Sequence, residues 1–257
     1  MLTFEQLKKE YSGVELAYPK NILVEYLQYE LLDSIYKQKK SSSLIFIGGT
    51  AIRIVHNGNR FSEDLDFDNH GLSFSDFSKL MQEVVRDMEL KGFNIEFRFV
   101  EKGAFYCYIK FPKILLNNNL SSLESEKILV RIDTVKRKKI FPTEVFVLNK
   151  FNVYRNILVN PIDIALSQKL MTIIGRPRKK GRDFYDISYL YSKTEPNFSY
   201  ILKNYSLQKD EFSKKILDIC RDLNFKDLSR DVEPFLIQPE QIRRVQDFKS
   251  FIKNKLN

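Results

Sequence analysis

The stretch LIFIGGTAIRIVHNGNRFSEDLDFD, residues 44–68, decides the fold. Its first four residues are a short apolar run that ends at Gly48-Gly49, which predicts a buried strand. Apolar side chains then recur at helical spacing up to a turn signal at Asn57-Gly58, so a short helix is expected between the two glycine turns. In the last residues of the stretch, apolar and aspartate side chains alternate, which predicts a second strand.

Two carboxylates in the second strand indicate a metal site. Asp64 and Asp66 are two residues apart, so their side chains share one face of the strand while Leu65 and Phe67 fill the other. Carboxylates held side by side repel each other, and a protein that keeps them there usually has a cation between them. Oxygen ligands favour a hard ion, so we predict that Asp64 and Asp66 bind Mg²⁺ or Mn²⁺.

The Gly-Gly turn is a candidate phosphate-binding site, which a phosphoryl transfer requires in addition to a metal ion. Gly48 and Gly49 have no Cβ atoms and lead into the N-terminus of the predicted helix. The backbone can therefore approach a ligand closely, and free N–H groups with the helix dipole favour phosphate. Each piece alone is compatible with an ordinary strand, turn and helix with a solvated acidic edge. The ordered set predicts phosphoryl or nucleotidyl transfer.

These residues resemble a known family. Gly49-Thr50, followed after thirteen residues by Asp64-x-Asp66, is similar to the signature of the polymerase-β-like nucleotidyltransferase superfamily. More narrowly, GGT at 48–50 with RxSxDLDF at 60–67 resembles the AbiEii/AbiGii toxins of bacterial toxin–antitoxin and phage-defence systems. The resemblance implies an α/β (α+β) nucleotidyltransferase core with a mixed sheet, followed by a C-terminal helical domain. We place these domains at residues 1–155 and 156–257.

The resemblance also implies how this stretch binds its substrate. Gly48, Gly49 and Thr50, together with Ser62, are expected to hold the β- and γ-phosphates of a nucleoside triphosphate. Arg60 is expected to neutralise the negative charge that develops during transfer.

A later strand offers a third carboxylate. The segment KILVRIDTV, residues 127–135, predicts a strand with Arg131 and Asp133 on one face. Members of the superfamily usually carry a third acidic residue on a neighbouring strand, so the resemblance makes Asp133 the candidate third metal ligand. A strand-end aspartate beside the basic turn at 136–139 is an alternative that stays open.

The second half of the chain contains a further motif. A helix is predicted from Pro161 through Ile174, followed by the basic loop GRPRKKG and the segment RDFYDI. This order resembles the family's K…RDxxDL element, which is matched by Lys169, Arg182, Asp183 and Asp186, with Ile187 in place of leucine.

The resemblance assigns roles to these residues. Lys169 and Asp183 are the expected catalytic residues, and Arg182 and Asp186 are expected to bind or support the nucleotide. The alternatives are a surface lysine whose stem covers apolar surface, and an aspartate that complements a helix dipole.

Other patterns predict helices and one hairpin. The expected elements are helices within residues 1–40, a capped helix from Ser73 or Ser75 to about Lys91, a hairpin around Lys102-Gly103, an irregular segment at 112–126, and helices at 208–223 and 239–256.

Composition narrows the class of protein. The 43% hydrophobic and 29% charged content are typical of a soluble globular protein, and no apolar run approaches the ~20 residues that span a bilayer. The first residues, MLTFEQLKKEY, do not have the form of a signal peptide, and two cysteines make no disulfide framework. We expect a cytoplasmic protein without a membrane partner. The net charge of +9 is compatible with nucleic acid, a membrane surface or an acidic protein as partner, and charge alone does not choose among them.

Together these features predict a Mg²⁺-dependent nucleotidyltransferase, and the family resemblance implies that it acts as a toxin. The resemblance implies transfer from a nucleoside triphosphate to an RNA acceptor, notably the 3′ end of tRNA, and a cognate antitoxin as partner. Two alternatives remain open at this stage. One is a nucleotidyltransferase that modifies a protein, and the other is a nonenzymatic regulator that binds nucleotide or nucleic acid.

Overall fold

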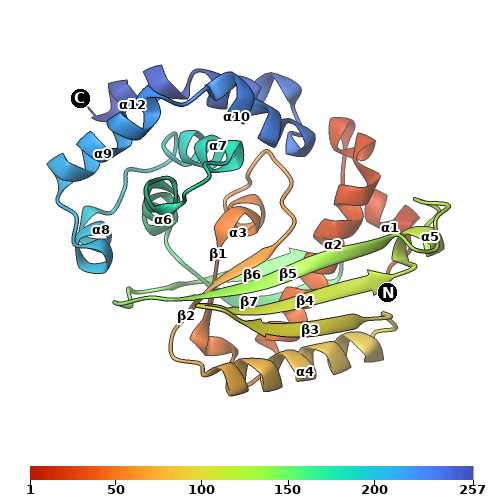
Figure 1. Ribbon diagram of the computed structural model, residues 1–257. Helices are drawn as coiled ribbons and strands as arrows, with labels where there is room; N and C mark the ends of the chain where they lie inside the picture. Colours follow the sequence, from red (N-terminus) through yellow and green to blue (C-terminus); the bar gives the residue numbers. More distant parts are fainter. Residues whose placement is uncertain (257) are drawn as a thin grey trace. The chain divides into compact units, whose positions relative to one another are not determined.

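The computed structural model describes residues 1–256, which form two compact units (Figure 1). The sheet unit comprises residues 1–51, 62–137 and 143–159. The helical unit comprises residues 52–61 and 138–142 together with the segment that begins at Asn160. Each unit therefore combines segments that are separated in the sequence. The division into domains at residues 1–155 and 156–257 stays a prediction.

The sheet unit confirms the predicted α+β class with a mixed sheet. In the described residues, seven strands form one sheet in the order β3-β4-β5-β2-β1-β7-β6. β1 pairs parallel with β7, β2 pairs parallel with β5, and the other neighbours are antiparallel. The strands are β1 (Leu44–Ile47), β2 (Leu65–Asn69), β3 (Glu96–Glu101), β4 (Phe105–Pro112), β5 (Lys127–Lys136), β6 (Glu144–Lys150) and β7 (Val153–Val159).

The quoted stretch folds as its pattern predicts. All four residues of β1 are buried, as expected for an apolar run at the centre of a sheet. The helix α3 (Gly48–Val55) follows directly, and Asn57 then adopts a left-handed conformation with φ 55°, which ends the helix. In β2, Leu65 and Phe67 are buried in the core of the unit.

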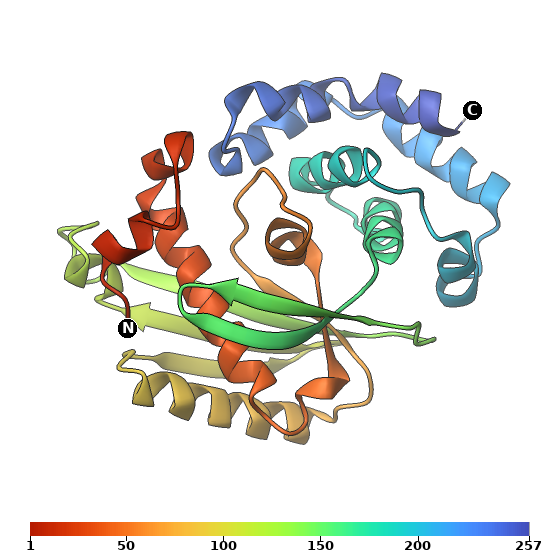
Figure 2. The same cartoon turned by 180° about the vertical axis from the view of Figure 1, so that it is seen from behind.

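Two helices cover one face of the sheet (Figures 1 and 2). Tyr36 of α2 contacts Phe67 of β2, and Phe77 of α4 contacts Phe99 of β3. The Tyr36 hydroxyl also donates to the Leu44 carbonyl, which fixes the end of α2 on the sheet. The helices of this unit are α1 (Phe4–Lys8), α2 (Pro19–Tyr36), the start of α3, α4 (Phe74–Leu90) and α5 (Ile114–Asn117).

The ends of α4 confirm the predicted caps. The Ser73 side chain accepts a hydrogen bond from the Asp76 backbone N–H, so Ser73 rather than Ser75 is the N-cap. Gly92 follows the helix with φ 91°. The hairpin at Gly103 is also confirmed, because β3 and β4 pair on either side of it.

Two parts of the sheet unit differ from expectation. The segment at 112–126 was expected to be irregular, but it contains the short helix α5. The β6–β7 hairpin was not predicted. Its turn is made by Phe151 and Asn152, both with positive φ of 57° and 64°, and not by glycine.

The helical unit has its own apolar core. The rings of Phe184, Phe225 and Phe248 contact one another at its centre. The prediction of one helix over 239–256 is wrong, because the chain forms a 3₁₀ turn, a short helix and a second helix with a break at Asp247. The helices are α6 (Ile162–Gly175), α7 (Gly181–Leu190), α8 (Phe198–Tyr205), α9 (Lys209–Arg221), α10 (Phe225–Val232), α11 (Arg243–Gln246) and α12 (Phe248–Leu256).

Hydrogen bonds explain why two short, distant segments belong to the helical unit. The Phe61 backbone N–H donates to the Phe235 carbonyl at 2.8 Å, next to an isolated bridge between Arg60 and Leu236. Residues 138–142 are held by the Lys139 backbone N–H, which donates to Asn204 Oδ1 of α8 at 3.0 Å. Across the described residues, no helix has the length and apolar character needed to cross a membrane.

Candidate active site

Three aspartates and an arginine lie together on the sheet. Asp66 of β2 is directly paired with Asp133 of β5, so both side chains point to the same face. Asp64 immediately precedes β2, and Arg131 is two residues before Asp133 on the same face of β5. The Arg131 guanidinium lies 2.9 Å from Asp64 Oδ2 and 2.9 Å from Asp133 Oδ1. The predicted metal ligands are therefore neighbours, and a positive charge is already present between two of them.

Asp133 is a largely buried carboxylate that lies close to two other negative charges. Burial, together with the nearby charges of Asp66 and Asp64, raises the pKa of Asp133 to about 7, although Arg131 opposes this rise. The geometry between Arg131 Nε and Asp133 Oδ1 is not that of a hydrogen bond, and this buried carboxylate oxygen has no hydrogen-bond partner. A single guanidinium therefore does not satisfy the negative charge of this group.

These features suit a hard divalent cation. The donor set consists of carboxylate oxygens, the ligands that Mg²⁺ and Mn²⁺ prefer, and Asp133 retains an unsatisfied oxygen. Within residues 1–256, however, no three His, Cys, Asp or Glu side chains converge as a ready-made metal site. Asp64, Asp66 and Asp133 are thus aligned by the sheet but not gathered around one point, and their binding of a metal stays a prediction.

The Gly-Gly turn lies against this carboxylate face. Gly48 has φ 82°, and a Cβ atom placed on it would overlap the carboxylate of Asp66, with Asp66 Cβ only 2.8 Å away. Only glycine fits both the backbone conformation and the close approach. The structure therefore brings the start of α3, the predicted phosphate cradle, into contact with a predicted metal ligand.

The neighbouring residues hold this arrangement in place. Thr50 is fully buried, and its hydroxyl donates to the backbone carbonyl of Asp64. The Ser62 carbonyl accepts a hydrogen bond of 2.9 Å from the Gln28 side chain. These contacts fix the backbone on both sides of Asp64. The predicted contacts of Thr50 and Ser62 with phosphate stay predictions.

The second predicted set of residues forms a buried ionic cluster in the helical unit. Arg60 donates to Asp186 through two hydrogen bonds, both 2.7 Å, and to the Phe61 carbonyl at 2.9 Å. Arg60 is 4% exposed and Asp186 is 1% exposed, so this bidentate pair is removed from water. In this arrangement Arg60 holds residues 56–61 to α7. Its predicted role in neutralising phosphate charge stays a prediction.

Lys169 connects the two aspartates of the motif. Its ammonium lies 2.8 Å from Asp186 Oδ2 and 3.2 Å from Asp183 Oδ1, and Asp183 also pairs with Arg176. Burial alone would lower the pKa of Lys169, but the two carboxylates raise it above its ordinary value, so the ammonium stays charged. The motif residues thus come together, and the cluster has three cationic groups and two carboxylates.

Sequence reasoning missed two cationic members of these groups. Arg131 shares a strand face with Asp133, a spacing that the sequence displays, but it was given no role in the site. Arg176 lies in the basic loop, whose single residues could not be ranked from sequence.

Arg182, which was predicted to bind nucleotide, places its guanidinium 4.7 Å from the centre of the Phe235 ring.

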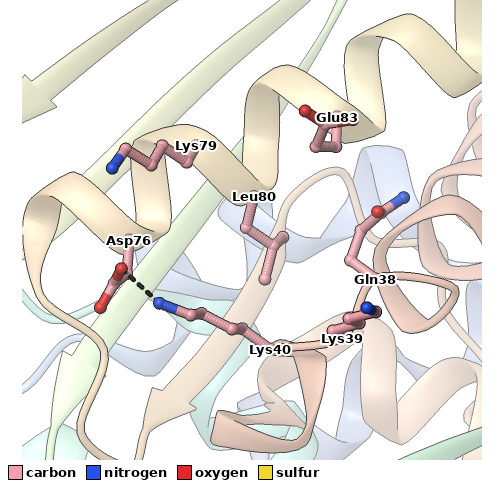
Figure 3. A pocket seen from close by; sticks show the side chains of 7 residues that line it. All are labelled: Gln38, Lys39, Lys40, Asp76, Lys79, Leu80 and Glu83. Atoms are coloured by element: carbon pink, nitrogen blue, oxygen red, sulfur yellow. Dashed lines mark hydrogen bonds and ion pairs between the residues drawn. The ribbon is translucent and has the colours of Figure 1, made fainter.

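A cavity of about 320 Å³ lies elsewhere on the sheet unit (Figure 3). Its walls come from residues 38–40, which follow α2, and from α4. Leu80, Lys40 and Asp76 are among the residues that line it, and Lys40 pairs with Asp76 at 2.5 Å. None of the predicted site residues lines this cavity.

The mixed sheet, its paired aspartates and the adjoining Gly-Gly helix start define a nucleotidyltransferase fold. Two solved structures share it. The chain matches the crystal structure of JHP933 from Helicobacter pylori with a TM-score of 0.55 and 18% identity, over 92% of this chain and 93% of that one. A second crystal structure, of an H. pylori protein provisionally assigned as a nucleotidyltransferase, matches with a TM-score of 0.56 and 17% identity, over 92% of this chain and 96% of that one.

Comparison with protein families is more specific. The family model described as "Nucleotidyl transferase AbiEii toxin, Type IV TA system" matches residues 30–254. The chain therefore belongs to the AbiEii nucleotidyltransferase toxin family, as its motifs predicted. No curated protein matches the chain by sequence comparison.

Proposed function

We propose that the protein is a toxin that transfers a nucleotide from a nucleoside triphosphate to an RNA acceptor, with the 3′ end of tRNA as the expected target. The observation that carries this proposal is the contact between Gly48 and the Asp66 carboxylate. It places a helix start suited to phosphate beside carboxylates suited to a cation, and both are needed for phosphoryl chemistry.

Asp64 and Asp66, with Asp133 as the third ligand, would hold Mg²⁺ or Mn²⁺. When bound, the ion supplies positive charge to the triphosphate. The backbone N–H groups of Gly48 and Gly49 at the start of α3 bind the β- and γ-phosphates. The phosphates can come close to the backbone because glycine has no Cβ atom. Thr50 keeps Asp64 in place through its hydrogen bond to the Asp64 carbonyl.

The reaction is a substitution at the α-phosphorus. An acceptor hydroxyl oxygen forms a new bond to this phosphorus, the bond to the β-phosphate oxygen breaks, and pyrophosphate leaves while the hydroxyl proton passes to solvent. Positioning and charge neutralisation account for most of the catalysis in such transfers. On the family motif we also assign nucleotide contacts to Ser62, Arg60, Lys169, Arg182, Asp183 and Asp186.

An incorporation assay tests this function. Purified protein is incubated with Mg²⁺, total RNA and each α-phosphate-labelled nucleoside triphosphate, beside an Asp64→Ala variant. We expect label in a tRNA-sized band, and no label with the variant or with a chelator. Label that enters protein would instead support a protein acceptor. Absence of label with every nucleotide, together with salt-sensitive RNA binding, would support a nonenzymatic regulator.

Growth assays test the toxin role. Expression of the wild-type protein should inhibit growth of its host, and Asp64→Ala should relieve this inhibition. We further propose that a cognate antitoxin, encoded beside the toxin gene, counteracts it and that the pair serves in phage defence. Inhibition that persists in Asp64→Ala would separate toxicity from the proposed chemistry.

A further inference from the structure

The carboxylate face of the sheet continues past the aspartates as two rows of side chains. In the first row, Asp66 is paired with Asp133, and Asp133 is paired with Tyr106 of β4. In the second row, Arg131 is paired with Tyr108 of β4. Directly paired residues point to the same face of a sheet, so both tyrosines share the face of the predicted metal ligands.

The second row ends in a stacked pair at the edge of the sheet. Arg98 of β3 is paired with Tyr108, and its guanidinium lies 4.3 Å from the centre of the Tyr108 ring. Arg98 is exposed, whereas Tyr106 and Tyr108 are half-buried. The face therefore offers aromatic rings next to guanidinium groups, the combination on which unpaired bases and their phosphates bind.

The charges of this part of the face favour a polyanion. Outside the aspartate cluster, the face carries Arg98, Lys110 and Lys127 against Glu96, which pairs with Lys127 at 2.8 Å. The aromatic rings begin one strand beyond Asp133, about 10 Å from the backbone of Asp66 at the usual spacing between strands. A single-stranded RNA bound along these rings could therefore place its end at the carboxylates.

We propose that the face formed by β3, β4 and β5 binds the unpaired 3′ end of the acceptor RNA, with bases stacked on Tyr106 and Tyr108 and phosphates attracted by Arg98 and Lys110. This inference rests on the proposed function and adds the surface that presents the acceptor. The acceptor must be single-stranded at this point, because bases inside a duplex stack on one another and cannot stack on side chains.

Binding of a fluorescein-labelled single-stranded oligoribonucleotide tests the surface without catalysis. Fluorescence anisotropy is measured without nucleotide for Tyr106→Leu, Tyr108→Leu and Tyr106→Phe. Each leucine variant should weaken binding about fivefold or more, the loss expected for one stacked base. Tyr106→Phe keeps the ring and should bind like the wild-type protein. The same strand annealed to its complement should bind more weakly than the single strand.

A tyrosine on another strand provides the matched control. Tyr154 of β7 is 75% exposed and lies in the same sheet, but it is not paired with β4 or β5. Tyr154→Leu should bind RNA like the wild-type protein. Arg98→Gln, a change at an exposed edge position, is the second test, because it does not depend on packing. It should lower the slope of log affinity against log salt by about 0.7.

Several outcomes would refute the proposal that this face binds unpaired RNA. These are unchanged binding by both leucine variants at melting temperatures close to that of the wild-type protein, equal binding of duplex and single strand, or a larger loss from Tyr154→Leu than from Tyr106→Leu. Failure of this inference is distinct from failure of the proposed function. If the wild-type protein labels RNA and the Tyr106→Leu variant has the same KM for RNA as the wild-type protein, only the proposed RNA-binding surface is refuted. If RNA binding follows the expected pattern but no nucleotide is transferred, only the enzymatic function is refuted.

Discussion

Replacement of Gly48 by alanine tests whether the Gly-Gly turn and the carboxylates act as one site. Alanine at φ 82° costs about 1–2 kcal/mol of backbone strain, which for a chain of this size lowers the melting temperature by about 2–8 °C. The new Cβ would also overlap the Asp66 carboxylate and displace it. A displacement of about 1 Å at a reacting centre lowers the rate about 100-fold. We therefore expect a modest loss of stability and a large loss of nucleotide transfer.

Gly92 provides the control for this prediction. It has φ 91°, and a Cβ atom there would meet nothing within 4 Å. Gly92→Ala should therefore lose similar stability but keep its activity. The measurement is the rate of label incorporation at equal concentrations of folded protein, with melting temperatures from circular dichroism. Equal activities of the two variants would refute the reasoning, because backbone strain alone would then explain both.

Two further predictions concern the helical unit. Asp186→Asn should lower the free energy of unfolding by about 3–5 kcal/mol in guanidinium titrations, because it leaves Arg60 charged and buried. The double variant Arg60→Met/Asp186→Leu should recover part of this loss, because it removes both charges. A loss below about 1 kcal/mol from Asp186→Asn would contradict the burial of the pair. Burial and then the charge of Lys193 lower the pKa of His56 to about 4, below its ordinary value of 6.5. The folded state therefore binds a proton at His56 less readily than the unfolded state does. The stability contributed by neutral His56 should be complete above about pH 7 and should fall as the pH drops through 6.5, by about 2 kcal/mol between pH 7 and pH 5. The measurement is the difference in the free energy of unfolding between the wild-type protein and His56→Gln across this range, which isolates His56 from the other groups that titrate there.

Much of the sheet unit could be predicted because its signals are local. The apolar run of β1, the turn at Asn57 and the cap at Ser73 each depend on a few adjacent residues. The β6–β7 hairpin was missed because its turn uses Phe151 and Asn152 in left-handed conformations, and phenylalanine is not a turn signal. The break at Asp247 was missed because the apolar spacing on both sides suggests one continuous helix.

In the candidate site, too, the sequence predicts local spacing but not which distant residues become neighbours. The spacing of Asp64 and Asp66 on a strand is a property of sequence, whereas their alignment with Asp133 depends on which strands become neighbours. The pairing of Arg60 with Asp186 joins residues 126 positions apart, and charge pattern alone cannot select such partners. Family resemblance placed both residues in one functional set, and the structure adds that they bind each other.

The interleaving of the two units has a consequence for how such a gene can change by recombination. The helical unit includes residues 52–61, which lie within the stretch that connects β1 to β2. A crossover that exchanged only the segment beginning at Asn160 would separate Asp186 from the Arg60 with which it is buried. Chimeras joined at that point should fold poorly unless both halves come from closely matched parents. Selection would then keep the segments of the sheet unit and of the helical unit together through recombination.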